Sequence, residues 1–251
     1  MSLPADHEDR GRAPSEQWTP TSGPEPDEKF TLKSGQRPFW QELILLLVIA
    51  MVLALVIKTF FLQAFYVPSD SMDNTLVPHD RIVVQKVSMW FGGAPQRGDV
   101  VVFDDPGGWL RPDEEQQPTN PVSRLLEFVG LYPTGGHLVK RVIGVGGDHV
   151  VCCDAEGRIT VNGVALNEKA YLPPGTKPSL IRFDVRVPKG YLWVQGDNRG
   201  DSEDSRAHFT QADPGGGMVP VTDVVGKVFA VVWPLGRATV LHRPATFGSV
   251  G

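Results

Sequence analysis

One uninterrupted apolar stretch constrains this chain more than any other feature. Residues 43–62 are apolar apart from Lys58 and Thr59. Roughly 20 residues of helix span about 30 Å, the thickness of the hydrocarbon core of a bilayer. A buried core helix is the alternative, but core helices are on average much shorter. The stretch therefore predicts one transmembrane helix, which we place within residues 38–64.

A cleavable export signal is the second alternative for this stretch. Such a signal carries a shorter apolar region, roughly 7–15 residues, and ends at small residues in an A-x-A pattern. Here the exit reads LQA at residues 62–64, so a bulky leucine stands two positions before Ala64. We therefore expect an uncleaved anchor.

Basic residues around the anchor indicate its orientation. Lys29, Lys33 and Arg37 precede it, whereas only Lys58 appears near its end before Arg81. Because cytoplasmic flanks carry the excess of lysine and arginine, this asymmetry predicts a cytoplasmic N-terminus and an extracytoplasmic remainder. The expected location is the cell membrane, with the lipid bilayer as a partner.

The pattern beyond the anchor is that of β structure. The 27 glycines and 22 prolines make the chain turn-rich, which favours β structure over a helix bundle. Residues 65–251 are expected to form the extracytoplasmic domain, and the polar, Pro-rich residues 1–37 a disordered tail. The NG pair at residues 162–163 predicts a hairpin. Short apolar or alternating runs predict strands at residues 81–87, 100–103, 138–145, 158–161, 184–187, 191–195 and 224–232.

Charge and cysteine content exclude several functions. The net charge of −5 argues against a nucleic-acid-binding protein, whose binding surface is basic. The two cysteines, Cys152 and Cys153, are adjacent, which is not the spacing of zinc-binding cysteines. Neighbouring Cα atoms lie about 3.8 Å apart across a trans peptide, closer than most disulfides allow. We interpret both cysteines as strand residues; a strained vicinal bridge and an intermolecular bridge are the alternatives.

The stretch PSDSM at residues 68–72 carries two hydroxyls. If it is extended, successive side chains alternate, so Ser69 and Ser71 lie on one face and Asp70 and Met72 on the other. Such a pair can supply a nucleophile and a hydrogen-bond donor side by side. The alternative is a serine-rich turn after a proline, since Pro, Ser and Asp are common turn residues.

A serine nucleophile needs a base. None of the six histidines stands in a nucleophile-elbow context, and the chain contains no G-x-S-x-G. The Ser–Lys pair is another known arrangement, and it needs a neutral, desolvated lysine. Lys140 lies among apolar residues in the run at 137–143, where it is either a solvent-face residue or a buried base.

Four motifs occur in order behind the anchor. Together they resemble bacterial type I signal peptidases, over roughly residues 65–233. The motifs are PSDSM at 68–72, RGDVVVF at 97–103, VKRVIG at 139–144 and GDNRGDSEDSR at 196–206.

The resemblance implies a mainly β, two-part antiparallel catalytic domain with Ser71 as nucleophile and Lys140 as general base. Ser69 matches the serine whose hydroxyl joins the Ser71 N–H in the oxyanion hole. Ser202 matches the serine that orients the lysine. The implied activity is removal of signal peptides from exported preproteins after small residues, without a metal or other cofactor and without nucleic acid.

The resemblance also implies structural ion pairs and a substrate pocket. Asp204 matches a partner of Arg206 near the site, and Asp197 is expected to pair with Arg141. The pocket for small side chains would be lined by Phe65, Val67, Leu76, Ile82, Val102 and Val139.

The chain departs from this family in two respects, and two other classes share its features. Asp70 stands where the family often has glycine, which would be costly if the position required φ > 0. The segments near 104–137 and 150–189 are matched less well.

A membrane-anchored β binding module would need no Ser–Lys pair. A self-cleaving Ser–Lys repressor would need a DNA-binding half that the sequence lacks.

Overall fold

The computed structural model describes residues 38–60, 62–86, 93–110, 120, 136–210 and 216–250. The predicted tail at 1–37 and most of the segment at 104–137 lie outside them. The predicted anchor is helical, as α1 (Phe39–Phe60), and its run of leucine, alanine and methionine favours helix. Among the residues described, no helix combines the length and the hydropathy that crossing a membrane requires.

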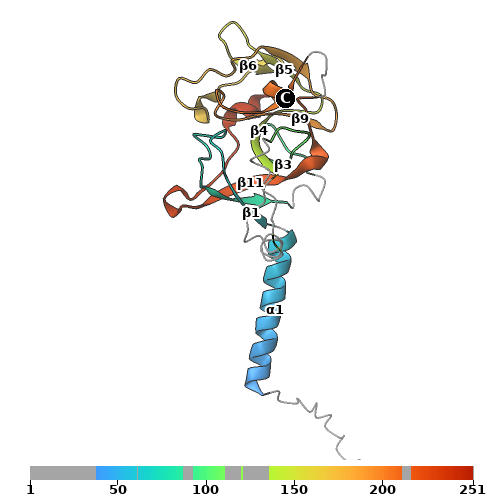
Figure 1. Cartoon of the computed structure of the whole chain (residues 1–251), viewed down its shortest axis with the longest axis vertical. Helices are drawn as coiled ribbons and strands as arrows, with labels where there is room; N and C mark the ends of the chain where they lie inside the picture. The colour runs from blue at the N-terminus through green and yellow to red at the C-terminus, as the bar shows by residue number, and fades with distance from the viewer. Residues whose placement is uncertain are drawn as a thin grey trace, which may run out of the picture. The chain divides into compact units, whose positions relative to one another are not determined.

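Two antiparallel sheets lie within residues 46–251 (Figure 1). The prediction of mainly β, antiparallel structure is confirmed. The larger sheet has the order β1 (Leu62–Tyr66), β2 (Arg81–Gln85), β11 (Val224–Trp233), β3 (Val100–Asp104), β4 (His137–Val145), β9 (Tyr191–Gln195) and β10 (Val219–Pro220), with β12 (Thr239–Val240) beside β11. The smaller sheet has the order β7 (Val164–Ala165), β6 (Ile159–Val161), β5 (His149–Cys152) and β8 (Phe183–Arg186).

Short helical turns lie between these strands and after the last of them. They are η1 (Glu168–Ala170), α4 (Ser205–His208), η2 (Val221–Asp223), η3 (Leu235–Arg237) and η4 (Ala245–Ser249). The predicted hairpin is present, with β6 and β7 on either side of Asn162, whose φ of 53° is accessible to asparagine.

The centre of the larger sheet is buried on both faces. Residues 100–103 of β3 are all buried, which explains why this strand is a continuous apolar run rather than an alternating one. On β4, Leu138 and Val142 pack into one apolar cluster, whereas Ile143 packs into another. Side chains at alternate positions of β4 therefore enter different parts of the core, and Lys140 lies between Leu138 and Val142 on one face.

The first strand begins inside the predicted anchor. We expected the anchor to extend to residue 64, but residues 62–64 belong to β1, which pairs with β2. Phe65 of this strand is buried in a core cluster. The apolar run alone does not mark this boundary, because Leu62, the first residue of the strand, is as apolar as most of the helix before it.

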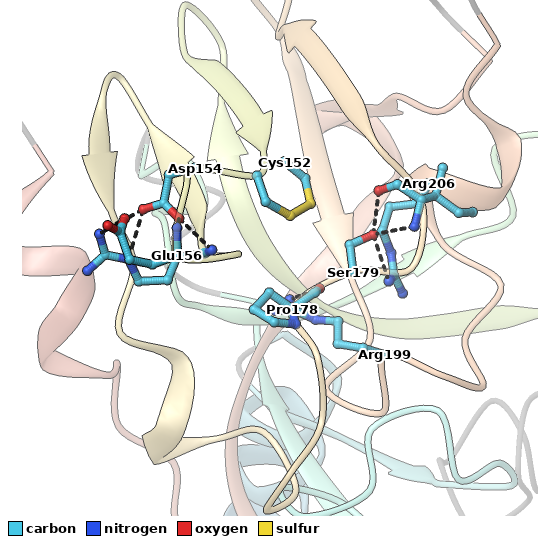
Figure 2. The surroundings of a disulfide bond; sticks show 10 residues. Cys152, Asp154, Glu156, Pro178, Ser179, Arg199 and Arg206 are labelled. Carbon is cyan, nitrogen blue, oxygen red and sulfur yellow. Dashed lines mark hydrogen bonds and ion pairs between the residues drawn. A yellow bond between two sulfur atoms is a disulfide. The ribbon is translucent and has the colours of Figure 1, made fainter.

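The two cysteines form a disulfide, so our interpretation of them as unbridged strand residues is wrong. Cys152 ends β5 and is bonded to Cys153, with the two Cα atoms 3.0 Å apart (Figure 2). Our argument assumed a trans peptide, whereas the peptide between these residues is cis.

Candidate active site

Ser71 begins a tight turn between β1 and β2. The amide of Asp73 donates to the carbonyl of Asp70 at 2.8 Å, and the amide of Leu76 donates to the carbonyl of Met72 at 2.8 Å. The side chains of Met72 and Leu76 are buried in an apolar cluster. Hydrogen bonds and apolar burial together fix the backbone that carries the Ser71 hydroxyl.

The extended conformation that we considered for residues 68–72 is therefore wrong, because the segment enters a turn. Ser69 and Ser71 still approach each other, with 3.3 Å between their Oγ atoms. Asp70 is exposed while Met72 is buried, so the expected shared face for these two residues does not exist. Asp70 is not among the residues of positive φ, so aspartate is not strained there.

Lys140 reaches Ser71 from the middle of β4. Its Nζ lies 2.7 Å from Ser71 Oγ, within a hydrogen bond. The lysine is 4% exposed and pairs across the sheet with Val101 of β3. Burial of an ammonium group disfavours its charged form, so this environment suits a lysine that must act as a base.

The loop after β9 holds the nucleophile's turn through its backbone. The amide of Asn198 donates to the carbonyl of Ser71 at 3.0 Å, and Thr75 Oγ1 donates to Asp197. Asp197 is in turn held by Arg141, whose Nε and Nη2 lie 2.8 and 2.6 Å from its carboxylate oxygens. The expected Asp197–Arg141 pair is thus present and faces away from Lys140.

The expected pair between Asp204 and Arg206 is also present and lies beside the site. The Arg206 side chain donates two hydrogen bonds to Asp204, at 2.9 and 2.7 Å, and the amides of Arg206 and Gly196 each donate one more at 3.0 Å. Burial opposes ionisation of Asp204, but Arg206, the Gly196 amide and the charge of Lys140 together outweigh it and lower the pKa of the carboxyl group. Arg206 therefore offsets a carboxylate that would otherwise stabilise the charged lysine.

Ser202 lies against the same loop. Its Oγ is buried, and among the described residues it has no hydrogen-bond partner. A Cβ added at Gly196 would lie 2.3 Å from this oxygen and 2.4 Å from the carbonyl oxygen of Ser71. The hydroxyl is therefore close to the nucleophile's turn, and its predicted role in orienting Lys140 stays a prediction.

A cavity of about 170 Å³ contains the two reactive groups. Leu76 and Ile82 do not line it, because both are fully buried in the cluster beneath. The cavity is lined by Ser71 and Lys140, by four of the six expected pocket residues, Phe65, Val67, Val102 and Val139, and by Ser69, among others.

Comparison with known proteins identifies the family of this chain. The family model "Signal peptidase, peptidase S26" matches residues 40–233. Signal peptidase I of Mycobacterium tuberculosis (strain ATCC 25618 / H37Rv) is 41% identical over 244 residues, covering 88% of this chain and 79% of that protein. The chain belongs to the signal peptidase family. Like its relatives in that family, it is a serine endopeptidase.

Other signal peptidases are similar over much of their length. Probable signal peptidase I of Mycobacterium leprae (strain TN) is 39% identical over 239 residues, covering 84% of this chain and 78% of that protein. A crystal structure of a signal peptidase I from Enterococcus faecalis V583 matches with a TM-score of 0.31 and 25% identity, over 53% of this chain and 95% of that one.

A buried network beside this peptidase site escaped the sequence analysis. Arg199 donates to Glu168 at 2.6 Å, Tyr171 donates to the same oxygen at 2.7 Å, and Arg199 Nε donates to the Gly196 carbonyl at 3.0 Å. Burial opposes the charge of Arg199, but Glu168, Tyr171 and Asp197 together outweigh it and raise the pKa of the guanidinium. Arg199 also donates to Pro178, which lies near the disulfide (Figure 2). Glu168 and Arg199 are 31 positions apart, so no local sequence pattern predicts the bond between them.

Gly196 allows the loop after β9 to approach the nucleophile. We expect Gly196→Ala to lower kcat/KM by about 100-fold or more, because its Cβ would force the Ser71 carbonyl to move and about 1 Å of misplacement can cost that much. Peptide cleavage rates and the melting temperature measure the effect. Gly200→Ala is the matched control, since a Cβ there meets nothing within 4 Å. A wild-type rate in Gly196→Ala would show that this close approach is unimportant.

Proposed function

We propose that this peptidase removes N-terminal signal peptides from exported preproteins with a Ser71–Lys140 dyad. The observation that carries the proposal is the 2.7 Å hydrogen bond between Ser71 Oγ and a buried Lys140 Nζ. A nucleophile paired with a base is the arrangement that covalent catalysis requires.

The chemistry follows from this geometry. Ser71 Oγ attacks the scissile carbonyl while the neutral amine of Lys140 takes the hydroxyl proton. The Ser71 N–H and the Ser69 hydroxyl donate to the resulting oxyanion. Lys140 then protonates the leaving amine, which releases the mature protein and leaves the signal peptide as an ester on Ser71. A water molecule that gives its proton to Lys140 hydrolyses that ester and restores the serine.

Substrate choice follows from the shape of the cavity. Its volume of about 170 Å³ is below the roughly 300–1,000 Å³ of typical ligand pockets, and Phe65, Val102 and Val139 give it apolar walls. Such a site admits small side chains and excludes bulky ones. We infer small residues at the first and third positions before the cut.

Membrane attachment is part of the same proposal. The apolar residues 43–62 would anchor the chain in the cell membrane by a single span, with the N-terminus in the cytoplasm and the catalytic domain outside. This places the peptidase on the side where exported precursors emerge. The support is the sequence pattern around the stretch and the family's action on exported proteins.

Ser69→Ala tests the oxyanion donor. We expect kcat to fall by roughly 10²–10³, because one donor to the developing oxyanion is worth that much. The KM should change little, since the ground-state carbonyl is bound less tightly than the oxyanion. Steady-state kinetics on a precursor peptide gives both constants. An unchanged kcat would mean that the Ser69 hydroxyl does not reach the oxyanion.

The substrate assignment is tested with matched precursors. Full-length protein in detergent is incubated with one exported precursor that has alanine at the first and third positions before the cut, and with a variant that has phenylalanine there. We expect cleavage of the first and none of the second. Equal cleavage of both would refute the proposed specificity, and cleavage of neither would refute the function.

A further inference from the structure

The segment that follows β3 reaches the cavity that contains Ser71. Trp109 and Leu110 both line this cavity, and both pack in the apolar cluster that contains Leu138 of β4. Neither residue had a role in the sequence analysis, because the region near 104–137 carries no motif. Leu110 is half-buried, so part of its side chain is available to a substrate.

The turn that precedes Leu110 is held by one carboxylate. Asp105 accepts hydrogen bonds from the amides of Gly107, Gly108, Trp109 and Leu110, at 2.9–3.3 Å. Burial opposes ionisation of Asp105, but these backbone donors outweigh it and lower the pKa of its carboxyl group. Gly107 and Gly108 have φ of 143° and 78°, values that suit glycine. The turn therefore has a defined backbone.

Trp109 fixes this turn to the rest of the domain. The indole is 4% exposed and stacks on the His208 ring of α4, with centroids 4.5 Å apart and planes 8° apart. It also meets the Phe103 ring edge to face, with centroids 6.0 Å apart. Two aromatic contacts thus hold the residue that precedes Leu110, and α4 itself is capped at its N-terminus by Asp204, which lies beside the active site.

We propose that Leu110 sets the size limit for one side chain of the preprotein and that Trp109 is the positioning residue that holds it there. The inference rests on the proposed signal peptidase function. A residue in the cavity wall can exclude a larger side chain only if it keeps its position. Leu110 meets this condition, because the Asp105 turn and the stacking of Trp109 on His208 both restrain it.

Leu110→Ala tests this role. The probes are precursor peptides that carry alanine or leucine at one position each, from the third residue before the cut to the second after it. Truncation of Leu110 removes three carbon atoms from the wall. We expect the leucine-to-alanine ratio of kcat/KM to rise about 10-fold or more at one of these positions only. The control is Leu180→Ala, which alters an exposed leucine that does not line the cavity and should leave every ratio unchanged.

Trp109 is tested by a pair of variants. Trp109→Ala should raise the same ratio at the same position, because the turn loses its stack on His208. Trp109→Phe keeps an aromatic ring there and should restore a ratio near that of the wild type. Melting temperatures identify any variant that fails to fold, and Leu110→Ala, which alters a half-buried side chain, still decides the main point.

The outcomes separate this inference from the function on which it rests. Wild-type protein that cleaves no precursor refutes the proposed function. Wild-type protein that cleaves, with ratios in Leu110→Ala that are unchanged, lowered or raised equally at every position, refutes the size limit alone. An unchanged ratio in Trp109→Ala refutes only the positioning role.

Discussion

Ser71→Ala should abolish precursor cleavage while the domain stays folded. The change removes the oxygen that attacks the scissile carbonyl, and loss of a serine nucleophile typically costs about 10⁴-fold or more in kcat. The backbone of the turn should persist, because the Asn198 amide binds the Ser71 carbonyl and Met72 remains buried. Cleavage of a precursor by purified protein, followed for hours, measures the loss.

Two controls make that result decisive. Far-ultraviolet circular dichroism and the melting temperature should match those of the wild type, since a hydroxyl is replaced by hydrogen at a position that the turn tolerates. Activity above a few per cent of wild type, in a preparation free of host peptidase, would show that another residue is the nucleophile.

Lys140→Arg should be equally inactive. An arginine side chain keeps the positive charge and length of lysine, but its guanidinium does not lose a proton in proteins and cannot accept one from Ser71. The loss therefore reports the need for a base rather than for a cation. The measurement is kcat/KM on the same precursor, with circular dichroism as the control for folding.

The wild-type rate should accordingly rise with pH as Lys140 loses its proton. Burial favours the neutral amine, so the rise should occur well below about 10.4, the pKa of a free lysine. Arg206→Ala should move the rise to higher pH. The Asp204 carboxylate would lose its partner Arg206 and would then stabilise the charged form of Lys140 more strongly. Robust activity in Lys140→Arg, or a rise that begins only near pH 10, would eliminate the Ser–Lys mechanism.

Most strands of this fold were predictable because their patterns are local. The residues of β3 and β9 are apolar and bounded by turn residues, and the NG pair specifies the turn between β6 and β7. The start of β1 was not predictable, because apolar residues continue from the helix into the strand. The turn at Ser71 was left open between two conformations, and tertiary hydrogen bonds from Asn198 help to decide it.

The dyad was inferred from four motifs in order, not from the local pattern around either residue. Lys140 within an apolar run fits a solvent-facing position as well as a buried one, and only the contact with Ser71 from a distant turn distinguishes them. The same limit explains why Leu76 and Ile82 were expected in the pocket: an apolar residue near the site can lie in its wall or in the core beneath it.

Other parts of the site had no signal in the sequence. Nothing in the sequence indicates that Glu168 and Arg199 bind each other, yet their side chains are 3% and 1% exposed and form an ion pair. Trp109 belongs to a region without periodicity, and its partner His208 is far along the chain. The adjacent cysteines were judged by the geometry of a trans peptide, which does not apply to them.

The most direct test of the central claim is the N-terminal sequence of the reaction product. Detergent-solubilised, full-length protein is incubated with an exported precursor, and the new N-terminus and the masses of both fragments are determined, with Ser71→Ala in parallel. The account predicts a single cut directly after the alanine of an A-x-A site and intact precursor in the variant. Cuts elsewhere in the precursor, or the same cut in Ser71→Ala, would contradict it.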